Sequence, residues 1–282
     1  VVQTALQKAG LEPHDIDAVA VTNRPGLLGS LLVGLSFAKG FSASLDIPFI
    51  TIDHIRAHLY ASQIEHPLEY PYLGLLVSGG HTVICRVDGY DAIEVLGTTI
   101  DDAIGEAFDK VAKHYGFGYP GGIAIDRLAK KGNPLAFLFP GPTLHSKDRP
   151  YDISYSGLKT AAINQLDTFW DGSSEKSPEN IAASFQRAAV NMLIKRVRAA
   201  LEETGLKRLS AGGGVAANSY LRLELEALKK GGYEVSFPSL KLCTDNGAMI
   251  AALAYRYLAD GIQGDYSESA SARVTAFKKQ YS

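Results

Sequence analysis

The sequence predicts an α/β protein with two lobes, each built from a sheet and covering helices. Helical and strand-like segments alternate over residues 1–64, which predicts a parallel sheet with helices packed on it. Three short strand-like segments joined by tight turns follow residue 72, and helices then alternate with single strands. The stretch between these parts, 65–71, holds Pro67 and Pro71 and is the predicted boundary.

The first lobe is predicted to span residues 1–68. Because the chain opens inside a helical stretch, with Val1 rather than Met, we expect that a preceding strand or hairpin of this lobe is missing. Apolar periodicity predicts a helix at 1–9, a strand at 17–21, a helix at 26–45, a strand at 47–52 and a helix at 54–64.

The second lobe is predicted to span 69–260, with a helical insertion at about 120–204, and residues 261–282 are expected to form a tail. Its sheet should be mixed, because a meander of strands precedes strands that alternate with helices. The predicted strands are 73–77, 82–87, 92–96, 208–211 and 234–237. The predicted helices are 103–115, 123–131, 156–166, 179–204, one after 212–214, and 246–259.

The composition is that of an ordinary globular protein, with 46% hydrophobic and 21% charged residues. No apolar run reaches the roughly 20 residues that cross a bilayer, and no basic segment followed by an apolar one marks the chain for secretion. The two cysteines, Cys85 and Cys243, argue against a disulfide framework and favour the cytoplasm. A net charge of −2 gives no broad attraction to phosphate backbones.

Two histidines, His54 and His58, are four residues apart on a predicted helix, so their rings lie on one face. This spacing suits two ligands of one metal ion, although it also arises by accident. Asp245, at a strand-to-helix junction, is the candidate third ligand, with an N-cap role as the alternative. No glutamate lies between the histidines, so the helix lacks the general base of a zinc peptidase.

Two glycine-rich turns each follow a predicted strand. The turn at 78–80 joins two strands, and the turn at 212–214 lies between a strand and a helix. Adjacent glycines let the backbone approach an anion closely, and an ordinary hairpin is the alternative for the first turn. Phosphates and nucleosides commonly dock at junctions of the second kind. Neither turn matches a Walker loop or a Rossmann fingerprint.

Three carboxylates, Asp102, Glu106 and Asp109, recur between these turns at helical spacing. They could bind ribose hydroxyls or a Mg²⁺-bound phosphate, and a solvated acidic face is the alternative. A third glycine turn, 119–122, precedes the helix that carries Asp126. The pattern therefore predicts a nucleotide in a cleft between the lobes, touched by several glycine turns.

Several long motifs in order make the sequence recognisable. They are NRPGLLGSLLVG (23–34), DHIRAHLYA (53–61), LLVSGGHT (75–82), DDAIGEAFDKVAKHYGFGYPGG (101–122), SYSGLKTA (154–161), GGGVAANSYLR (212–222) and CTDNGAMIA (243–251). With them the chain closely resembles the bacterial tRNA adenosine threonylcarbamoyltransferases, formerly called O-sialoglycoprotein endopeptidases. The resemblance implies a two-lobed actin-like ATPase fold of the sugar kinase, Hsp70 and actin type. It also implies mixed sheets, flanking helices and the absence of the first N-lobe strands.

The resemblance also implies residue roles, since the chain matches the family's motifs position by position. The implied cofactor is one divalent metal per subunit, Fe²⁺ or Zn²⁺, held by His54, His58 and Asp245. The implied ligand is ATP or threonylcarbamoyl-AMP, with Mg²⁺ as a further candidate. The residues implied to hold it are Leu76, Val77, Ser78, Gly79, Gly80, Asp109, Gly122, Asp126 and Asn218.

The implied activity is transfer of a threonylcarbamoyl group from threonylcarbamoyl-AMP to N6 of adenosine 37, in tRNAs that read codons beginning with A. The implied partners are tRNA, an inactive paralogue and a small ATPase, with a homodimer left open and no membrane. Because basic residues are scattered, we expect partner proteins to help position tRNA. They are Lys130, Lys131, Lys147, Arg149, Lys195, Arg196, Arg198, Lys229, Lys230, Lys278 and Lys279. No catalytic general base is assigned.

Three alternatives stay open on the sequence. A zinc metallopeptidase would cleave glycoproteins in a manner dependent on His54. A small-molecule kinase of the same superfamily would consume ATP when given its acceptor. A non-enzymatic scaffold would pair with an active paralogue, and the absence of the family's N-terminal phosphate motif from this sequence keeps that option in view.

Overall fold

The computed structural model describes residues 1–141 and 150–273, and these form two compact units. Unit 1 consists of Val1–Tyr60 together with the described chain from Asn246 onward, and unit 2 consists of Ala61–Asp245. The chain therefore leaves unit 1 once and returns to it.

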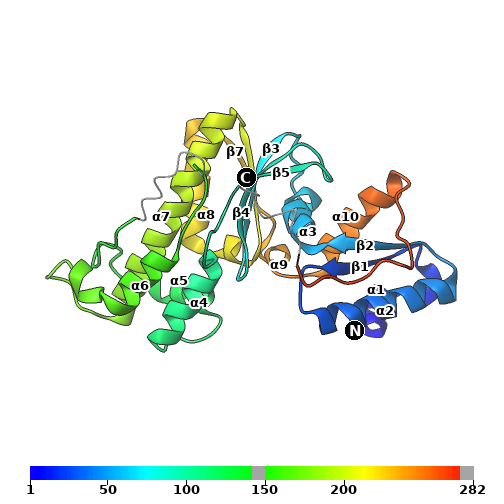
Figure 1. Cartoon of the computed structure of the whole chain (residues 1–282), viewed down its shortest axis with the longest axis horizontal. Coiled ribbons are helices and arrows are strands. Elements are labelled where there is room, and N and C mark those ends of the chain that lie inside the picture. The colour runs from blue at the N-terminus through cyan, green and yellow to red at the C-terminus, as the bar shows by residue number, and fades with distance from the viewer. Residues whose placement is uncertain (142–149, 274–282) are drawn as a thin grey trace. The chain divides into compact units, whose positions relative to one another are not determined.

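Unit 1 is built on a parallel pair of strands that pairs Val19 with Phe49 and Arg24 with Asp53. The chain must cross over between parallel strands, and here a helix makes the connection. Figure 1 shows α2 on one face of this pair and α10 on the other. The elements are α1 (Val2–Ala9), β1 (Val19–Arg24), α2 (Leu28–Leu45), β2 (Phe49–Asp53), α3 (His54–Tyr60) and α10 (Gly247–Ala259).

Helix α2 has a largely apolar sequence and exposes several large side chains, among them Leu27 at its N-cap, Val33 and Phe37. In the described part of the chain it is the one helix whose length and composition would allow it to cross a membrane, which the sequence analysis did not anticipate. Core helices of soluble proteins and signal sequences share this length and composition.

Unit 2 is built on a five-stranded mixed sheet with the order β5-β4-β3-β6-β7. Strands β3, β4 and β5 form the predicted antiparallel meander, and β6 and β7 run parallel to β3. The carboxyl ends of β3 and β6 therefore meet at one edge of the sheet. The strands are β3 (Tyr72–Val77), β4 (Thr82–Val87), β5 (Ile93–Thr98), β6 (Arg208–Gly212) and β7 (Glu234–Ser236).

The main core of unit 2 joins this sheet to its helices, with Leu75 of β3 packed among side chains such as Phe108 and Phe185. Figure 1 shows α4, α5, α6 and α7 gathered on one side of the sheet. Cys85 and Cys243 are buried and unbridged, as expected. The helices are α4 (Ile104–His114), α5 (Gly121–Ala129), α6 (Ser156–Asn164), α7 (Pro178–Thr204), α8 (Ser219–Glu226) and α9 (Leu240–Cys243).

The observed boundaries differ from the predicted lobes 1–68 and 69–260 and from the predicted tail. Helix α10 packs on α3 and the strands of unit 1. The segment after it returns to the same unit, where the Lys39 ammonium donates to the carbonyl oxygen of Tyr266 at 2.6 Å. The predicted insertion at 120–204 is also not separate, because α7 buries Val190 and Leu193 in the core of unit 2. These contacts join segments that are distant in the sequence, so the local apolar periodicity could not predict them.

Local differences are smaller. Strand β1 begins two residues after the predicted start and ends at Arg24. The helix predicted at 54–64 ends at Tyr60 and continues as a 3₁₀ turn over Ala61–Ile64. Lys147, Arg149, Lys278 and Lys279 lie outside the described residues.

Candidate functional site

The turn after β3 is closed by its own polar groups. The Ser78 amide donates to the carbonyl oxygen of His81 at 2.8 Å, and the His81 amide donates to Ser78 Oγ at 3.1 Å. A Cβ atom added at Gly79 or Gly80 would meet nothing within 4 Å. Neither glycine has a positive φ. Within the described chain, neither packing nor backbone geometry explains these glycines, and the space beside them is open.

Helix α4 begins against this turn. A Cβ atom at Gly105 would lie 2.6 Å from the carbonyl oxygen of Ser78 and 2.8 Å from Cα of Gly79. The Ile104 amide donates to the buried hydroxyl of Thr82 at 3.0 Å, which fixes the start of the helix to β4. The positive end of the α4 dipole therefore lies beside an open glycine turn, an arrangement that favours an anion.

The second glycine turn lies against the end of β3. Gly213 has φ +90°, and a Cβ atom there would lie 2.3 Å from the carbonyl oxygen of Val77. Because β3 and β6 are parallel neighbours, both turns lie at the carboxyl edge of the sheet. Ligands of open α/β sheets bind outside this edge.

Asp109 connects α4 to the third glycine turn. Its Oδ1 accepts a hydrogen bond from the Gly121 amide at 2.7 Å, at the start of α5. The two helices meet closely here, since a Cβ atom at Gly121 would lie 2.5 Å from Cα of Asp109. Gly122 follows in the first turn of α5 and approaches Phe108.

The side chains of Asp126 and Asn218 are engaged in holding the start of α8. Asp126 Oδ1 accepts from the Ser219 amide at 3.1 Å and from the Ser219 hydroxyl at 2.7 Å, and its Oδ2 pairs with Lys130 at 3.3 Å. Asn218 caps α8 by accepting from the Leu221 amide at 3.0 Å, and its Nδ2 donates to Gln186 at 2.7 Å. Both residues thus belong to the framework that joins α5, α7 and α8 behind the second turn.

The predicted row of three carboxylates does not act as one acidic face. Asp102 accepts from both Lys110 and Lys159, at 2.5 and 2.6 Å. Burial raises the pKa of Asp102, but the hydrogen bonds from these two lysines outweigh burial and hold the pKa below its usual range. Glu106 pairs with Lys110 at 2.9 Å. The hydrogen bonds that the Lys110 ammonium donates to these two carboxylates raise its pKa.

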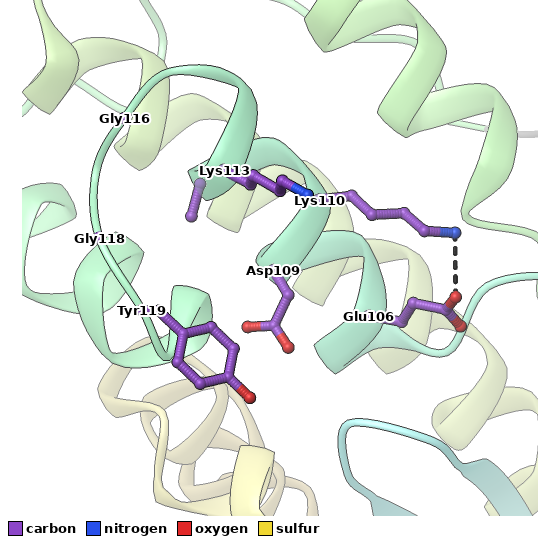
Figure 2. Close-up of a pocket in the computed structure, with 8 residues that line it drawn as sticks. Glu106, Asp109, Lys110, Lys113, Gly116, Gly118 and Tyr119 are labelled. Carbon is purple, nitrogen blue, oxygen red and sulfur yellow. Dashed lines mark ion pairs between the residues drawn. The ribbon is translucent and has the colours of Figure 1, made fainter.

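Asp109 opens onto a cavity of about 460 Å³, within the size range of small-molecule sites. Figure 2 shows the Asp109 carboxylate and the Tyr119 ring beside the same space, below the loop that carries Gly116 and Gly118. Lys113 also lines this space. The sequence motifs did not mark Tyr119 and Lys113 as site residues. Their signals were the aromatic residue that opens a glycine turn and the four-residue spacing from Asp109 to Lys113.

The histidine pair lies in unit 1. Helix α3 begins at His54, and the Nε2 atoms of His54 and His58 are 3.1 Å apart. Asp245 directly precedes Asn246 at the start of α10, and one ligand atom from each of the three residues lies within 4.8 Å of the others. The N-cap of α10 is Asn246, whose side chain accepts from the Met249 amide at 2.9 Å, so the alternative N-cap role of Asp245 is wrong.

Two imidazoles and one carboxylate are a donor set that suits Zn²⁺ or Fe²⁺ and leaves coordination positions open. His58 is buried and His54 is half-buried, whereas Asp245 is exposed. The chemistry of the three residues therefore fits a divalent metal.

The family model described as tRNA N6-adenosine threonylcarbamoyltransferase matches residues 1–252. The chain belongs to this family. A relative of that name from Treponema denticola is 58% identical over 99% of this chain and 82% of its own length. Relatives of the same name from Treponema pallidum and Borreliella burgdorferi are 51% and 49% identical, and the chain covers 79% of each.

Solved structures support the fold of this family member. HypF in its phosphate- and nucleotide-bound form matches with a TM-score of 0.66 at 18% identity, over 91% of this chain and 41% of HypF. Component A of the Acidaminococcus fermentans (R)-2-hydroxyglutaryl-CoA dehydratase matches with a TM-score of 0.55 at 17% identity, over 92% of this chain and 83% of that protein. These likenesses confirm the predicted fold class.

The transferase family accounts for the motifs that led to the resemblance, and the protein is an enzyme of that family. No finding favours the metallopeptidase, the small-molecule kinase or the scaffold.

Proposed function

We propose that the protein transfers the threonylcarbamoyl group from threonylcarbamoyl-AMP to N6 of adenosine 37 in tRNAs that read codons beginning with A. Membership of the transferase family supports the reaction. The observation in the structure that carries the proposal is the turn Ser78–Gly80, whose glycines leave open space beside the start of α4.

The phosphate of the adenylate would bind at this turn. Backbone N–H groups and the N-terminus of α4 supply positive partial charge without a side chain that must be ordered. Asp109, which uses Oδ1 to hold Gly121, would direct Oδ2 to the ribose hydroxyls. Gly122, Asp126 and Asn218 would complete the site, the last two by fixing α8 against the second turn. The same surface would accept ATP, with Mg²⁺ as its counter-ion.

The reaction needs an activated donor, because the adenine N6 lone pair is delocalised into the ring. In the proposed step a bond forms between N6 and the carbamoyl carbon while the bond from that carbon to the AMP phosphate oxygen breaks. One proton leaves N6, and AMP takes the bonding electron pair. The turn would stabilise the phosphate as it gains charge, which lowers the energy of the transition state.

His54, His58 and Asp245 would hold one divalent metal, Fe²⁺ or Zn²⁺. When bound, such an ion supplies a Lewis acid that stabilises negative charge on the threonylcarbamoyl oxygen. The donor chemistry of the three residues supports this role. By fixing the position of the ion, these residues would orient the threonylcarbamoyl group.

We further propose that the protein works in the cytoplasm with tRNA, an inactive paralogue and a small ATPase. Its net charge of −2 supports a need for partner proteins at the tRNA backbone. The two unbridged cysteines are compatible with a reducing compartment.

A reconstituted transfer assay tests the proposal. It contains unmodified tRNA, threonine, bicarbonate, ATP, the adenylate-forming enzyme and the partner proteins, with nucleoside analysis by mass spectrometry. Modified adenosine should require this protein and vanish with Asp245→Ala. Glu202→Ala, an exposed change on α7, is the matched control and should leave the product unchanged. Intact adenylate without modified tRNA in the wild-type reaction would contradict the proposal.

A further inference from the structure

Asp53, the last residue of β2, is a buried carboxylate with both oxygens engaged. Its side chain is 3% exposed. Oδ1 accepts from the Ile55 amide at 2.9 Å and from the Arg56 amide at 3.3 Å, and Oδ2 pairs with Arg24 Nε at 3.3 Å. Because an uncompensated buried charge is costly, these partners hold the carboxylate in one orientation.

The two accepted amides belong to the first turn of α3. A helix leaves its first N–H groups without intrahelical acceptors, and Asp53 supplies one. Helix α3 has only seven residues, so its own hydrogen bonds constrain its direction weakly. Asp53 therefore fixes the start of α3 to the end of β2, while packing on α10 holds the rest of the helix.

The direction of α3 decides the geometry of the histidine pair. His54 is the first residue of the helix and His58 lies one turn later, with their Nε2 atoms 3.1 Å apart. A metal site loses affinity when its ligands are displaced by a fraction of an ångström, so the support beneath the ligands matters as much as their identity.

Arg24 provides the second attachment of this support. It ends β1 and pairs in register with Asp53, so the ion pair joins the ends of both strands. The Arg24 side chain is 50% exposed, whereas Asp53 is covered. Its guanidinium therefore compensates the buried charge from the solvent side, and removing Arg24 would leave the Asp53 charge with backbone donors alone.

We infer that Arg24 and Asp53 are positioning residues of the histidine pair, an ion pair that aims α3 so that His54 and His58 can hold one metal ion together. This inference rests on the metal site proposed above. Neither residue needs to touch the metal, because both act through the start of α3.

The test is a Zn²⁺ titration of the whole protein by calorimetry, followed by thermal unfolding of each metal-free variant. Asp53→Asn keeps an oxygen that can cap α3 but removes the negative charge. Arg24→Gln removes the positive charge, and because the Arg24 side chain is half-exposed the variant should still fold. Each should weaken Zn²⁺ binding about tenfold. The double variant should bind no more weakly than either single variant, because the pair acts as one unit. Arg24→Lys should be intermediate.

Ser42→Ala is the matched control for stability. It removes hydrogen bonds of a buried hydroxyl to the Ile47 carbonyl oxygen and the Tyr266 hydroxyl, in the same unit but away from α3. It should lower the unfolding temperature without changing Zn²⁺ affinity. His54→Ala should abolish binding and thereby locate the ion.

The outcomes separate the two proposals. Wild-type protein that fails to bind Zn²⁺, or binds it equally well with His54→Ala, would contradict the metal site and the positioning role with it. His54-dependent binding that survives both Asp53→Asn and Arg24→Gln at full affinity would overturn the positioning role alone. A Ser42→Ala variant that weakens Zn²⁺ binding as much as Asp53→Asn and Arg24→Gln do would also overturn the positioning role.

Discussion

The two glycine turns of unit 2 stand at the ends of neighbouring parallel strands, β3 and β6, and differ in what surrounds them. At Gly213 the backbone has a positive φ and a Cβ atom would overlap the carbonyl oxygen of Val77. At Gly79 and Gly80 the backbone is ordinary and a Cβ atom would meet open space.

This difference shows that glycine can occupy a turn for two reasons, the fold or a ligand. The fold itself requires Gly213, because its positive φ and its close contact with the Val77 carbonyl oxygen leave no room for a side chain. The described protein gives no such reason for Gly79 and Gly80, and a ligand that approaches the backbone would supply one. Substitution should therefore affect folding at one turn and binding at the other.

Gly213→Ala should have the largest effect. The positive φ and the overlap with Val77 should together destabilise the protein by about 3 kcal/mol. Urea unfolding measures this loss. Gly214→Ala is the matched control, because its Cβ would meet nothing within 4 Å, and it should change stability little. Equal stability of the two variants would contradict a structural requirement at Gly213.

Gly105→Ala should come next. Its Cβ would press on Ser78 and Gly79 from the start of α4, at a cost of about 2 kcal/mol, and would displace the first turn. We expect both lower stability in urea and weaker binding of AMP in calorimetry. Gly157→Ala in α6, which has open space, should instead stabilise the protein slightly. A Gly105→Ala variant with wild-type AMP affinity would show that the turn does not contribute to binding.

Gly80→Ala should leave the unfolding free energy within about 0.5 kcal/mol of wild type, because the added methyl meets no protein atom. The methyl would occupy the space proposed for the phosphate, so AMP affinity should fall about tenfold, or ~1.4 kcal/mol. Calorimetry and urea unfolding on the same sample measure both quantities. Unchanged affinity would remove the distinction between the two turns.

Asp102→Asn should have the smallest effect, a modest loss of stability at neutral pH that disappears in acid. The pKa of Asp102 is lowered in the folded protein, so its contribution to stability is present above the unfolded pKa of about 3.9 and is lost as pH falls through the folded value. Wild type should therefore lose more stability than Asp102→Asn on acidification below about pH 4. Asp17→Asn, at an exposed carboxylate, serves as control. Parallel acid profiles for wild type and Asp102→Asn would contradict the ion-pair assignment.

Periodicity predicted the elements that local sequence determines. The meander of β3, β4 and β5 and the long helix α7 lie within two residues of their predicted bounds. The return of α10 to unit 1 could not be predicted, because it depends on packing between segments that are distant in the chain.

The sequence predicted which residues belong to the candidate site more fully than it predicted the contacts that these residues make. The motifs named Asp126 and Asn218, but their hydrogen bonds to Ser219 and Leu221 depend on the tertiary fold. The pairing of Arg24 with Asp53 depends on strand register, which the sequence alone did not specify. Residues that act by supporting others carry the weakest sequence signal.

The most direct test of the central claim is the affinity of a non-hydrolysable threonylcarbamoyl-adenylate analogue for wild type and for Asp109→Ala. The account predicts at least about tenfold weaker binding, because a charged hydrogen-bond acceptor for the ribose is lost. Glu202→Ala should bind the analogue as wild type does. Equal affinity of wild type and Asp109→Ala would mean that the adenylate does not bind at the glycine turns of unit 2.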